Sequence, residues 1–272
     1  ELDDTIVLKN GQTRYYHYHC REYNRNQRIF PTALQIFRLG LGQPAVNFPA
    51  LTARFLYEHF TEHIKGDVIV YDPSSGWGGR ILGAMCTNRK LHYIGTDPNP
   101  DNVGRYENVA KFYNTHCNQD NPFFGDGSSN TFEIYQLGSE VIGDDENFLK
   151  YFGKLDFVFT SPPYFNREQY SQDENQSFKK FSAYEDWRDN FLKPTLTTAF
   201  SFLKNDRYLC WNIADIKIGE NKFIPLEQDS IDVIESLGGE YKGIYKMLTT
   251  RMVGIDASNV KNSVKIDGES YK

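Results

Sequence analysis

The stretch Val68-Ile-Val-Tyr-Asp-Pro-Ser-Ser-Gly-Trp-Gly-Gly79, followed by Arg80-Ile-Leu-Gly-Ala-Met85, decides the fold class. A short β-branched run ends at Asp72 in a glycine-rich turn, and residues 80–85 then resume with helical spacing. The pattern predicts a strand, a glycine loop and a helix in direct succession.

Further runs of β-forming residues follow, with helical segments expected near residues 102–113 and 183–203. The runs are 92–97, 123–126, 155–160 and 207–213. Strands joined through helices need crossover connections, and these produce parallel sheets. The sequence therefore predicts an α/β, Rossmann-like fold with a mostly parallel sheet and helices on both faces. Two β-like segments near the end of the chain, 243–248 and 264–266, predict an antiparallel hairpin at the sheet edge.

Composition narrows the class of protein. The chain has 272 residues, of which 39% are hydrophobic and 15% aromatic, which is enough to bury a core. We see no apolar stretch of bilayer length and no signal-peptide pattern at the start, so we expect a cytoplasmic protein without a membrane partner. The four cysteines form no CxxC pair and the histidines form no ligand pattern, so we predict neither a disulfide frame nor a metal site.

Charge divides the chain unevenly. The net charge is −6, yet residues 1–47 carry six Lys and Arg against four Asp and Glu. We therefore separate an N-terminal arm or partial accessory region, 1–47, from a main domain, 48–272. The arm is either a solvated segment or a local contact for a polyanion.

Polar markers follow the expected strands at regular intervals. Asp97 lies 25 positions after Asp72, Asp126 follows after 29 more, and Ser161 after a further 35. Each interval is about one βα unit, so all four markers should line one edge of the sheet. Ligands of open parallel sheets bind at the carboxyl ends of the strands.

Each marker has a chemical use and an ordinary alternative. Gly76, Gly78 and Gly79 allow close approach to the backbone, although neither a pyrophosphate nor a triphosphate motif is present. Asp97 is placed to accept hydrogen bonds from a ribose diol, or else it is a turn or N-cap residue. Asp126 is placed to accept a bond from an adenine amino group, but Gly125-Asp-Gly127 is also an ordinary turn.

Ser161-Pro-Pro-Tyr164 is the sharpest signal in the sequence. Two prolines fix φ twice and remove two donors, which leaves a rigid wall of carbonyl acceptors suited to an exocyclic amine. Tyr164 offers a flat face on which an extruded base could stack. The alternative is a proline-rich turn with a packing tyrosine.

These motifs resemble those of the S-adenosylmethionine-dependent DNA amino-methyltransferases. Asp72-Pro-Ser-Ser-Gly-Trp-Gly-Gly79 is similar to the cofactor loop of that family, and Thr160-Ser-Pro-Pro-Tyr-Phe165 is similar to its catalytic [DNS]-P-P-[YFW] tetrapeptide. Trp211-Asn-Ile-Ala-Asp215 resembles the strand after the tetrapeptide. Phe48-Pro-Ala-Leu-Thr52 falls where the family's segment contacting the methionine end of the cofactor lies. The resemblance covers about residues 48–250.

The resemblance implies a set of site residues. The catalytic residues would be Ser161, Pro162, Pro163 and Tyr164. S-adenosyl-L-methionine would be held by Pro49, Thr52, Asp72, Pro73, Ser74, Gly76, Gly78, Gly79, Asp97, Pro98, Asp126 and Ser161. For nucleic-acid contact we select Phe165, Arg167, Lys179 and Lys180 after the tetrapeptide, and Arg21, Arg25 and Arg28 in the arm.

The function implied is methyl transfer to an exocyclic amino group of a flipped base in double-stranded DNA. The serine of the tetrapeptide favours cytosine N4 slightly over adenine N6. Residues 127–160 are too few for a recognition domain, so a recognition subunit or a homodimer would supply sequence specificity. Two alternatives stay open: an RNA amino-methyltransferase, and a catalytically silent methyltransferase-like subunit that binds nucleic acid.

Overall fold

A five-stranded parallel sheet forms the centre of the computed structural model. The structure describes residues 47–117, 130–165, 177–218 and 222–247, together with the strands of two short hairpins near the chain ends. The sheet order is β5-β4-β3-β6-β7, and every neighbouring pair is parallel. The strands are β3 (Val68–Asp72), β4 (Leu91–Thr96), β5 (Thr131–Tyr135), β6 (Leu155–Thr160) and β7 (Leu203–Trp211). The predicted α/β, Rossmann-like fold is confirmed.

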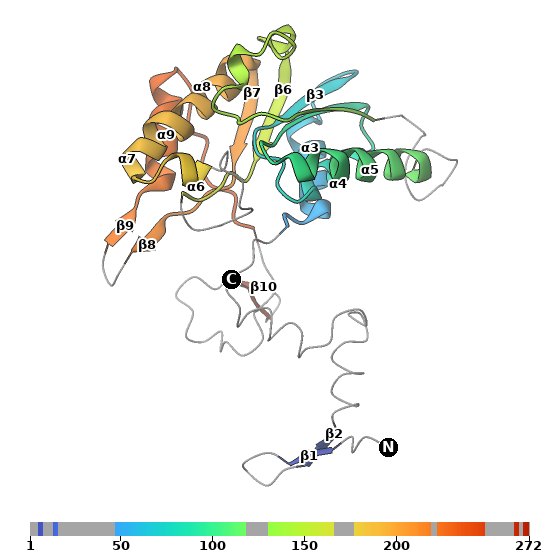
Figure 1. Ribbon diagram of the computed structural model, residues 1–272. Helices are drawn as coiled ribbons and strands as arrows, with labels where there is room; N and C mark the ends of the chain where they lie inside the picture. The colour runs from blue at the N-terminus through green and yellow to red at the C-terminus, as the bar shows by residue number, and fades with distance from the viewer. Residues whose placement is uncertain are drawn as a thin grey trace.

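Three helices cover one face of the sheet: α3 (Ala50–Thr61), α4 (Gly79–Met85) and α5 (Pro100–Cys117). Figure 1 shows them grouped on one side of β3 and β6. Val70, Tyr93 and Phe157 point to this face and are fully buried against these helices. Since successive strand residues alternate between faces, their neighbours on each strand form a second core on the other side.

The second face is covered by the 3-10 turns η1 (Ile142–Asp144) and η2 (Leu149–Tyr151) and by α8 (Lys193–Phe202). Tyr71 and Val158 point to this side and pack around Phe148. The helices expected on both faces are therefore present, and apolar residues on both sides of the sheet explain why β6 is buried along its whole length.

A third apolar cluster lies beyond β7. It is formed by α7 (Tyr184–Trp187), the π-helical turn η3 (Arg188–Leu192), α8 and α9 (Leu226–Ser236), with the antiparallel pair β8 (Ile216–Ile218) and β9 (Lys222–Ile224). The short helix α6 (Ser177–Lys180) precedes these elements in the chain. Trp187 is its largest fully buried side chain. Among the helices that the structure describes, none is long and apolar enough to cross a membrane.

The third strand of the prediction is displaced along the chain. The strand beside β4 is Thr131–Tyr135, and the predicted run 123–126 lies outside the described residues. Asn130 fixes its start, because its Oδ1 accepts a bond from Leu91 N at 2.9 Å and its Nδ2 donates to the last carbonyls of α4, including Met85 O at 3.1 Å.

In the antiparallel hairpin near the end of the chain, one of the two segments that we predicted pairs with a different partner. Strand β10 (Val264–Ile266) pairs with β11 (Glu269–Tyr271), and the pair is separate from the five-stranded sheet. The described part of the other predicted segment, residues 243–247, is not a strand. A second short hairpin joins β1 (Thr5–Val7) to β2 (Thr13–Tyr15).

The sheet order reverses between β3 and β6. From β3 the chain moves outward to β4 and β5, then returns to the other side of β3 to place β6 and β7. Such a reversal leaves a crevice at the carboxyl ends of the two central strands, where ligands of open α/β sheets bind. We therefore expect the ligand-binding residues in the loops after β3, β4, β5 and β6.

Candidate functional site

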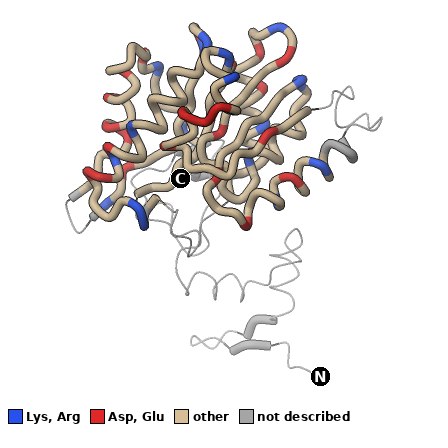
Figure 2. Tube along the Cα trace, turned by 45° about the horizontal axis from the view of Figure 1, so that its top comes forward, with Lys and Arg blue, Asp and Glu red and all other residues tan. Residues whose placement is uncertain are grey.

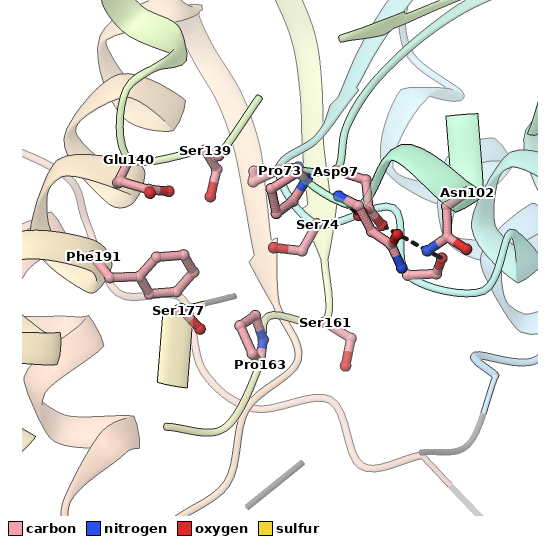
Figure 3. Close-up of a pocket in the computed structure, with 14 residues that line it drawn as sticks. Pro73, Ser74, Asp97, Asn102, Ser139, Glu140, Ser161, Pro163, Ser177 and Phe191 are labelled. Atoms are coloured by element: carbon pink, nitrogen blue, oxygen red, sulfur yellow. Dashed lines mark hydrogen bonds between the residues drawn. The ribbon is translucent and has the colours of Figure 1, made fainter. Parts of the chain in front are cut away.

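An open pocket lies at this crevice, and the empty space in and immediately in front of it, part of which is open solvent, is about 600 Å³. Residues from the ends of four strands line it, and Figure 3 shows Asp97 and Asn102 on one side facing Glu140 and Phe191 on the other. The lining residues are Pro73, Ser74, Gly76, Asp97, Pro98, Asn99, Asn102, Gly138, Ser139, Glu140, Ser161, Pro163, Ser177 and Phe191. The glycine loop, Asp97 and Ser161 thus reach one edge of the sheet, as their spacing predicts.

Asp72 lies beneath the pocket rather than in its lining. Its side chain is buried and accepts hydrogen bonds from Arg80 Nε, Tyr93 Oη and Thr160 Oγ1, each at 2.7 Å. Burial alone would lower the pKa of Arg80, but the carboxylate of Asp72 outweighs it and the pKa is raised. With donors from three elements around it, Asp72 is built to hold the glycine loop in place, which is a different role from the direct cofactor contact we predicted.

The glycine loop is clamped between the ends of β4 and β6. Ser74 N donates to Thr160 Oγ1 at 3.1 Å, and Thr96 Oγ1 donates to the Pro73 carbonyl at 2.6 Å. Gly76 and Gly78 have φ of 61° and 85°, which side chains rarely adopt, so glycine is required at both positions. Gly76 lines the pocket, whereas Gly78 caps α4 behind it.

Gly79 is required by a close contact. A Cβ at this position would lie 2.0 Å from the Phe48 carbonyl oxygen, and Gly79 N donates to Asn47 Oδ1 at 2.9 Å. The segment before α3 therefore sits directly on the glycine loop, including Asn47, the last residue of the predicted arm. Pro49 is exposed at the helix start and Thr52 is half-buried; neither lines the pocket.

Asp97 enters the pocket from the end of β4. It is 7% exposed, and its carboxylate accepts bonds from Asn99 N at 2.8 Å, from Tyr106 Oη and from Asn102 Nδ2 at 3.4 Å. Burial raises the pKa of Asp97, although these three bonds oppose the shift. The Tyr106 hydroxyl also contacts the Gly76 carbonyl and shares its one proton between that oxygen and Asp97, so it joins the acid to the glycine loop. The four-residue spacing of Asn102 and Tyr106 on a helix is the signal that could have identified both.

The loop after β5 supplies a wall that the sequence analysis missed. Ser139 and Glu140 line the pocket, and the Glu140 side chain, only 7% exposed, forms an ion pair of 2.9 Å with Lys180. A Cβ at Gly138 would lie 2.3 Å from Glu140 Oε2, so glycine leaves the space into which this carboxylate folds. Placing the third strand at residues 131–135 would have revealed these residues.

The tetrapeptide contributes Ser161 and Pro163 to the pocket floor. Asn212, directly after β7, donates from Nδ2 to Ser161 Oγ at 3.0 Å. Tyr164 does not line the pocket; its ring is half-buried and its hydroxyl donates to the Asn212 carbonyl at 3.1 Å. The Pro163 carbonyl, which we predicted as part of a wall of acceptors for a substrate amine, accepts a bond from Phe165 N at 3.1 Å.

Phe165 corrects one of our nucleic-acid predictions. It is 5% exposed and packs its ring against Tyr184 and Trp187, with centroid separations of 5.7 and 6.0 Å. Its φ of 45° is rare for a bulky residue, and its burial among these rings holds the backbone there. Phe165 therefore anchors the end of the tetrapeptide in the core instead of meeting a ligand at the surface.

Phe191 is the aromatic ring that does line the pocket. It is 4% exposed and belongs to η3, a π-helical turn between α7 and α8. Such turns are rare and are frequent at functional sites, because one extra residue redirects the side chains that follow. We know of no sequence pattern in residues 188–192 that would have predicted it.

Basic residues are dispersed over the part of the chain that the structure describes. Figure 2 shows Lys and Arg interspersed with Asp and Glu there. Lys180 pairs with Glu140, and Lys179 is half-buried. Arg21, Arg25, Arg28, Arg167 and Asp126 lie outside the described residues. Within the described ranges, no group of three or more His, Cys, Asp or Glu could hold a metal ion.

Comparisons with known proteins find similar solved structures but no matching family. No protein-family model and no curated protein matches the chain. Similar solved structures include a short-chain dehydrogenase from Oenococcus oeni PSU-1, with a TM-score of 0.40, 12% identity and coverage of 64% of this chain and 74% of that one.

Two further structures resemble a larger share of the chain. Magnesium protoporphyrin IX methyltransferase from Synechocystis PCC 6803, with bound SAM, has a TM-score of 0.39 and 14% identity over 92% of this chain and 91% of that one. A Corynebacterium glutamicum protein has a TM-score of 0.37 and 16% identity over 87% and 93%. Likenesses at this level show no activity for this chain.

Proposed function

We propose that this protein is an S-adenosylmethionine-dependent methyltransferase that acts on an exocyclic amino group of a DNA base, with cytosine N4 slightly favoured over adenine N6. One observation carries the proposal: the glycine loop, Asp97 and the Ser161–Pro163 turn, far apart in sequence, line a single pocket at the reversal point of the sheet. Two of the motifs that carry the resemblance to amino-methyltransferases, the glycine loop and the tetrapeptide, therefore line the same pocket.

The pocket residues fit the proposed cofactor. S-adenosylmethionine, when bound, would supply an electrophilic methyl group on a sulfonium ion. Asp97 gives the pocket a carboxylate, and its negative charge favours a cationic ligand, whereas the charge of Glu140 is balanced by Lys180. Asp97 Oδ1 accepts one bond from Asn99 N, and a carboxylate oxygen has capacity for a second, here from a ribose hydroxyl. Gly76 allows the ligand to approach the backbone.

The turn at Ser161 is suited to orienting an amine. The Ser161 hydroxyl and the Pro162 carbonyl would accept the two N–H bonds of the substrate amino group, and this would favour a pyramidal nitrogen with an available lone pair. The contribution of the chain is orientation and electrostatic stabilisation, and none of these steps needs a thiol nucleophile. Asp72 and Thr160 keep the turn and the glycine loop at a fixed separation, because they bond to each other across β3 and β6.

Product analysis tests the proposal. Purified protein is incubated with methyl-labelled S-adenosylmethionine and unmodified duplex DNA, and the digested nucleosides are identified by mass spectrometry. We expect N4-methylcytosine or, second, N6-methyladenine, and a loss of at least about ten-fold in rate for Ser161→Ala. If a parallel reaction labels RNA and not DNA, RNA takes the place of DNA as the proposed substrate. The proposal fails if no nucleoside is methylated and calorimetry detects no cofactor binding.

The charge distribution around the site is the basis for the partners that we propose. Residues 47–247 include the sheet and the pocket, and basic residues there are interspersed with acidic ones. We therefore propose that a recognition subunit or a second copy of the chain selects the DNA sequence. Repeating the assay over a protein concentration series tests the second copy, since rate per protomer should rise with concentration if a dimer is needed.

A further inference from the structure

We propose that Asn212 is the positioning residue that holds the Ser161–Tyr164 turn in its reactive shape, an inference that rests on the proposed function. Asn212 follows the last residue of β7, and Trp211 is paired in register with Thr160 at the end of β6. Asn212 and Ser161 therefore leave the sheet side by side, each directly after one of two adjacent parallel strands.

Three groups of Asn212 contact the turn or the residue before it. Its backbone N–H donates to the Thr160 carbonyl at 2.9 Å, and its carbonyl accepts the Tyr164 hydroxyl at 3.1 Å. Its side-chain Nδ2 donates to Ser161 Oγ at 3.0 Å. A single residue directly after β7 thus contacts the entry, the first side chain and the last side chain of the turn.

The side-chain contact is the one that bears on chemistry. A serine side chain has three staggered rotamers, and without a partner it exchanges among them. The bond from Asn212 selects the rotamer of Ser161 that lines the pocket, and it occupies one of the two acceptor sites of the hydroxyl oxygen. The other acceptor site then remains for the substrate amine. Asn212 does not line the pocket, so it acts through Ser161.

The other contacts explain why one substitution can isolate this effect. The bonds to Thr160 and Tyr164 use the backbone of Asn212, so they persist when its side chain is removed. Pro162 and Pro163 keep the turn rigid between its ends, and buried Phe165 anchors the exit. We therefore expect Asn212→Ala to fold with the turn in place and with only the Ser161 side chain released.

A double-mutant cycle measures the coupling. Asn212→Ala should lower kcat by about ten-fold while leaving the affinity for S-adenosylmethionine unchanged, because the reacting amine loses a fixed acceptor. In the Ser161→Ala background, the same change should have no further effect on kcat. Asn212→Asp keeps a hydrogen-bond partner for the hydroxyl and should recover most of the rate. Asn205→Ala is the matched control, since Asn205 is exposed on β7 near the end of the strand opposite to Asn212.

A second readout does not depend on activity. Three-bond couplings between Hα and Hβ in serine-labelled protein report the χ1 rotamer of Ser161, which we expect to be single in the wild type and averaged in Asn212→Ala. If the couplings are the same in both proteins, or if the two substitutions reduce kcat additively, the positioning role is overturned. If the wild type methylates nothing but the couplings change as expected, the proposed function fails and the role of Asn212 in ordering Ser161 stands.

Discussion

Arg80 Nε lies 2.7 Å from Asp72 Oδ2, and both side chains are at most 5% exposed. The pair joins the start of α4 to the end of β3, directly below the glycine loop, and Arg80 also donates to the Ser74 carbonyl within that loop. A buried ion pair contributes little net stability when intact, but removal of one partner leaves an uncompensated charge in the core. The pair therefore couples the shape of the loop to the stability of the domain.

Arg80→Ala should destabilise the protein by about 3 to 5 kcal/mol, because Asp72 would stay buried without its cation. The measurement is urea unfolding followed by circular dichroism. Lys90→Ala is the control: Lys90 also pairs with an aspartate, Asp67, at 2.7 Å, but both side chains are more than half exposed, so a loss below about 1 kcal/mol is expected. Similar losses in the two variants would contradict a structural role for the buried pair.

Gly79→Ala tests the contact between the glycine loop and the segment before α3. The new methyl group would overlap the Phe48 carbonyl and Asn47 Oδ1, so the segment must move and cofactor affinity should fall by about ten-fold or more. Calorimetry with S-adenosylmethionine measures the change.

Gly104→Ala provides the contrast for that experiment. Gly104 lies within α5 and is exposed, and a methyl group added there would meet open space. We expect this variant to bind normally and to gain about 0.5 to 1 kcal/mol of stability, since alanine favours a helix interior over glycine. Equal loss of affinity in the two variants would show that the Gly79 contact has no special role.

The raised pKa of Asp97 predicts that cofactor binding depends on pH. The carboxylate form of Asp97 accepts the bond from the ribose hydroxyl, and burial raises the pKa of this group, so the protonated fraction grows at a higher pH than for an ordinary aspartate. Affinity for S-adenosylmethionine should therefore weaken on mild acidification. Asp97→Asn should bind weakly at every pH and lose this dependence, whereas Asp101→Asn, an exposed change in the first turn of α5, should retain the wild-type profile.

The raised pKa of Asp97 has the opposite consequence for the stability of the free protein: acidification weakens cofactor binding but favours the folded state. Because the folded pKa of Asp97 is raised, its protonation favours the folded state at low pH, and this contribution is lost as the pH rises through the folded value. Asp97→Asn should remove that loss, so the free protein should become more stable near neutral pH. Thermal unfolding of the two proteins across a pH series checks the sign, and a destabilised variant near neutral pH would contradict it.

The parts of the fold that can be predicted from sequence are those with strong local signals. The strand at 155–160 has the predicted bounds because its six residues are all buried, and the glycine loop is recognisable because its conformation demands glycine. The third strand is harder to place because two short aromatic runs compete, 123–126 and 131–135, and the register with β4 depends on the long-range contacts of Asn130.

The candidate site is predictable only where residues lie at strand ends. Asp97 and Ser161 line the pocket as their positions predict, whereas Asp72 is turned into the core by three donors from other elements. Glu140 is missed together with the third strand, and Phe191 reaches the pocket through a π-helical turn that has no pattern of its own. The burial of Phe165 escapes prediction because a sequence gives no sign of which rings surround it.

Substitutions of Tyr164 distinguish two roles of the tetrapeptide's aromatic residue: stacking through its ring and hydrogen bonding through its hydroxyl. Its hydroxyl bonds to the Asn212 carbonyl, and its ring packs at the margin of the third apolar cluster. Tyr164→Ala should cut turnover strongly while cofactor affinity stays near normal, since both the ring and the tie to β7 are lost. Tyr164→Phe keeps the ring and removes one hydrogen bond, which is worth about 1 kcal/mol, so a loss of turnover below about ten-fold is expected.

Single-turnover rates measure the turnover of the Tyr164 variants, and calorimetry measures their cofactor affinity separately. If Tyr164→Phe is as slow as Tyr164→Ala, the bond to Asn212 is the important contact and stacking on the ring is not; if both variants lose cofactor affinity, Tyr164 supports the cofactor side of the pocket instead.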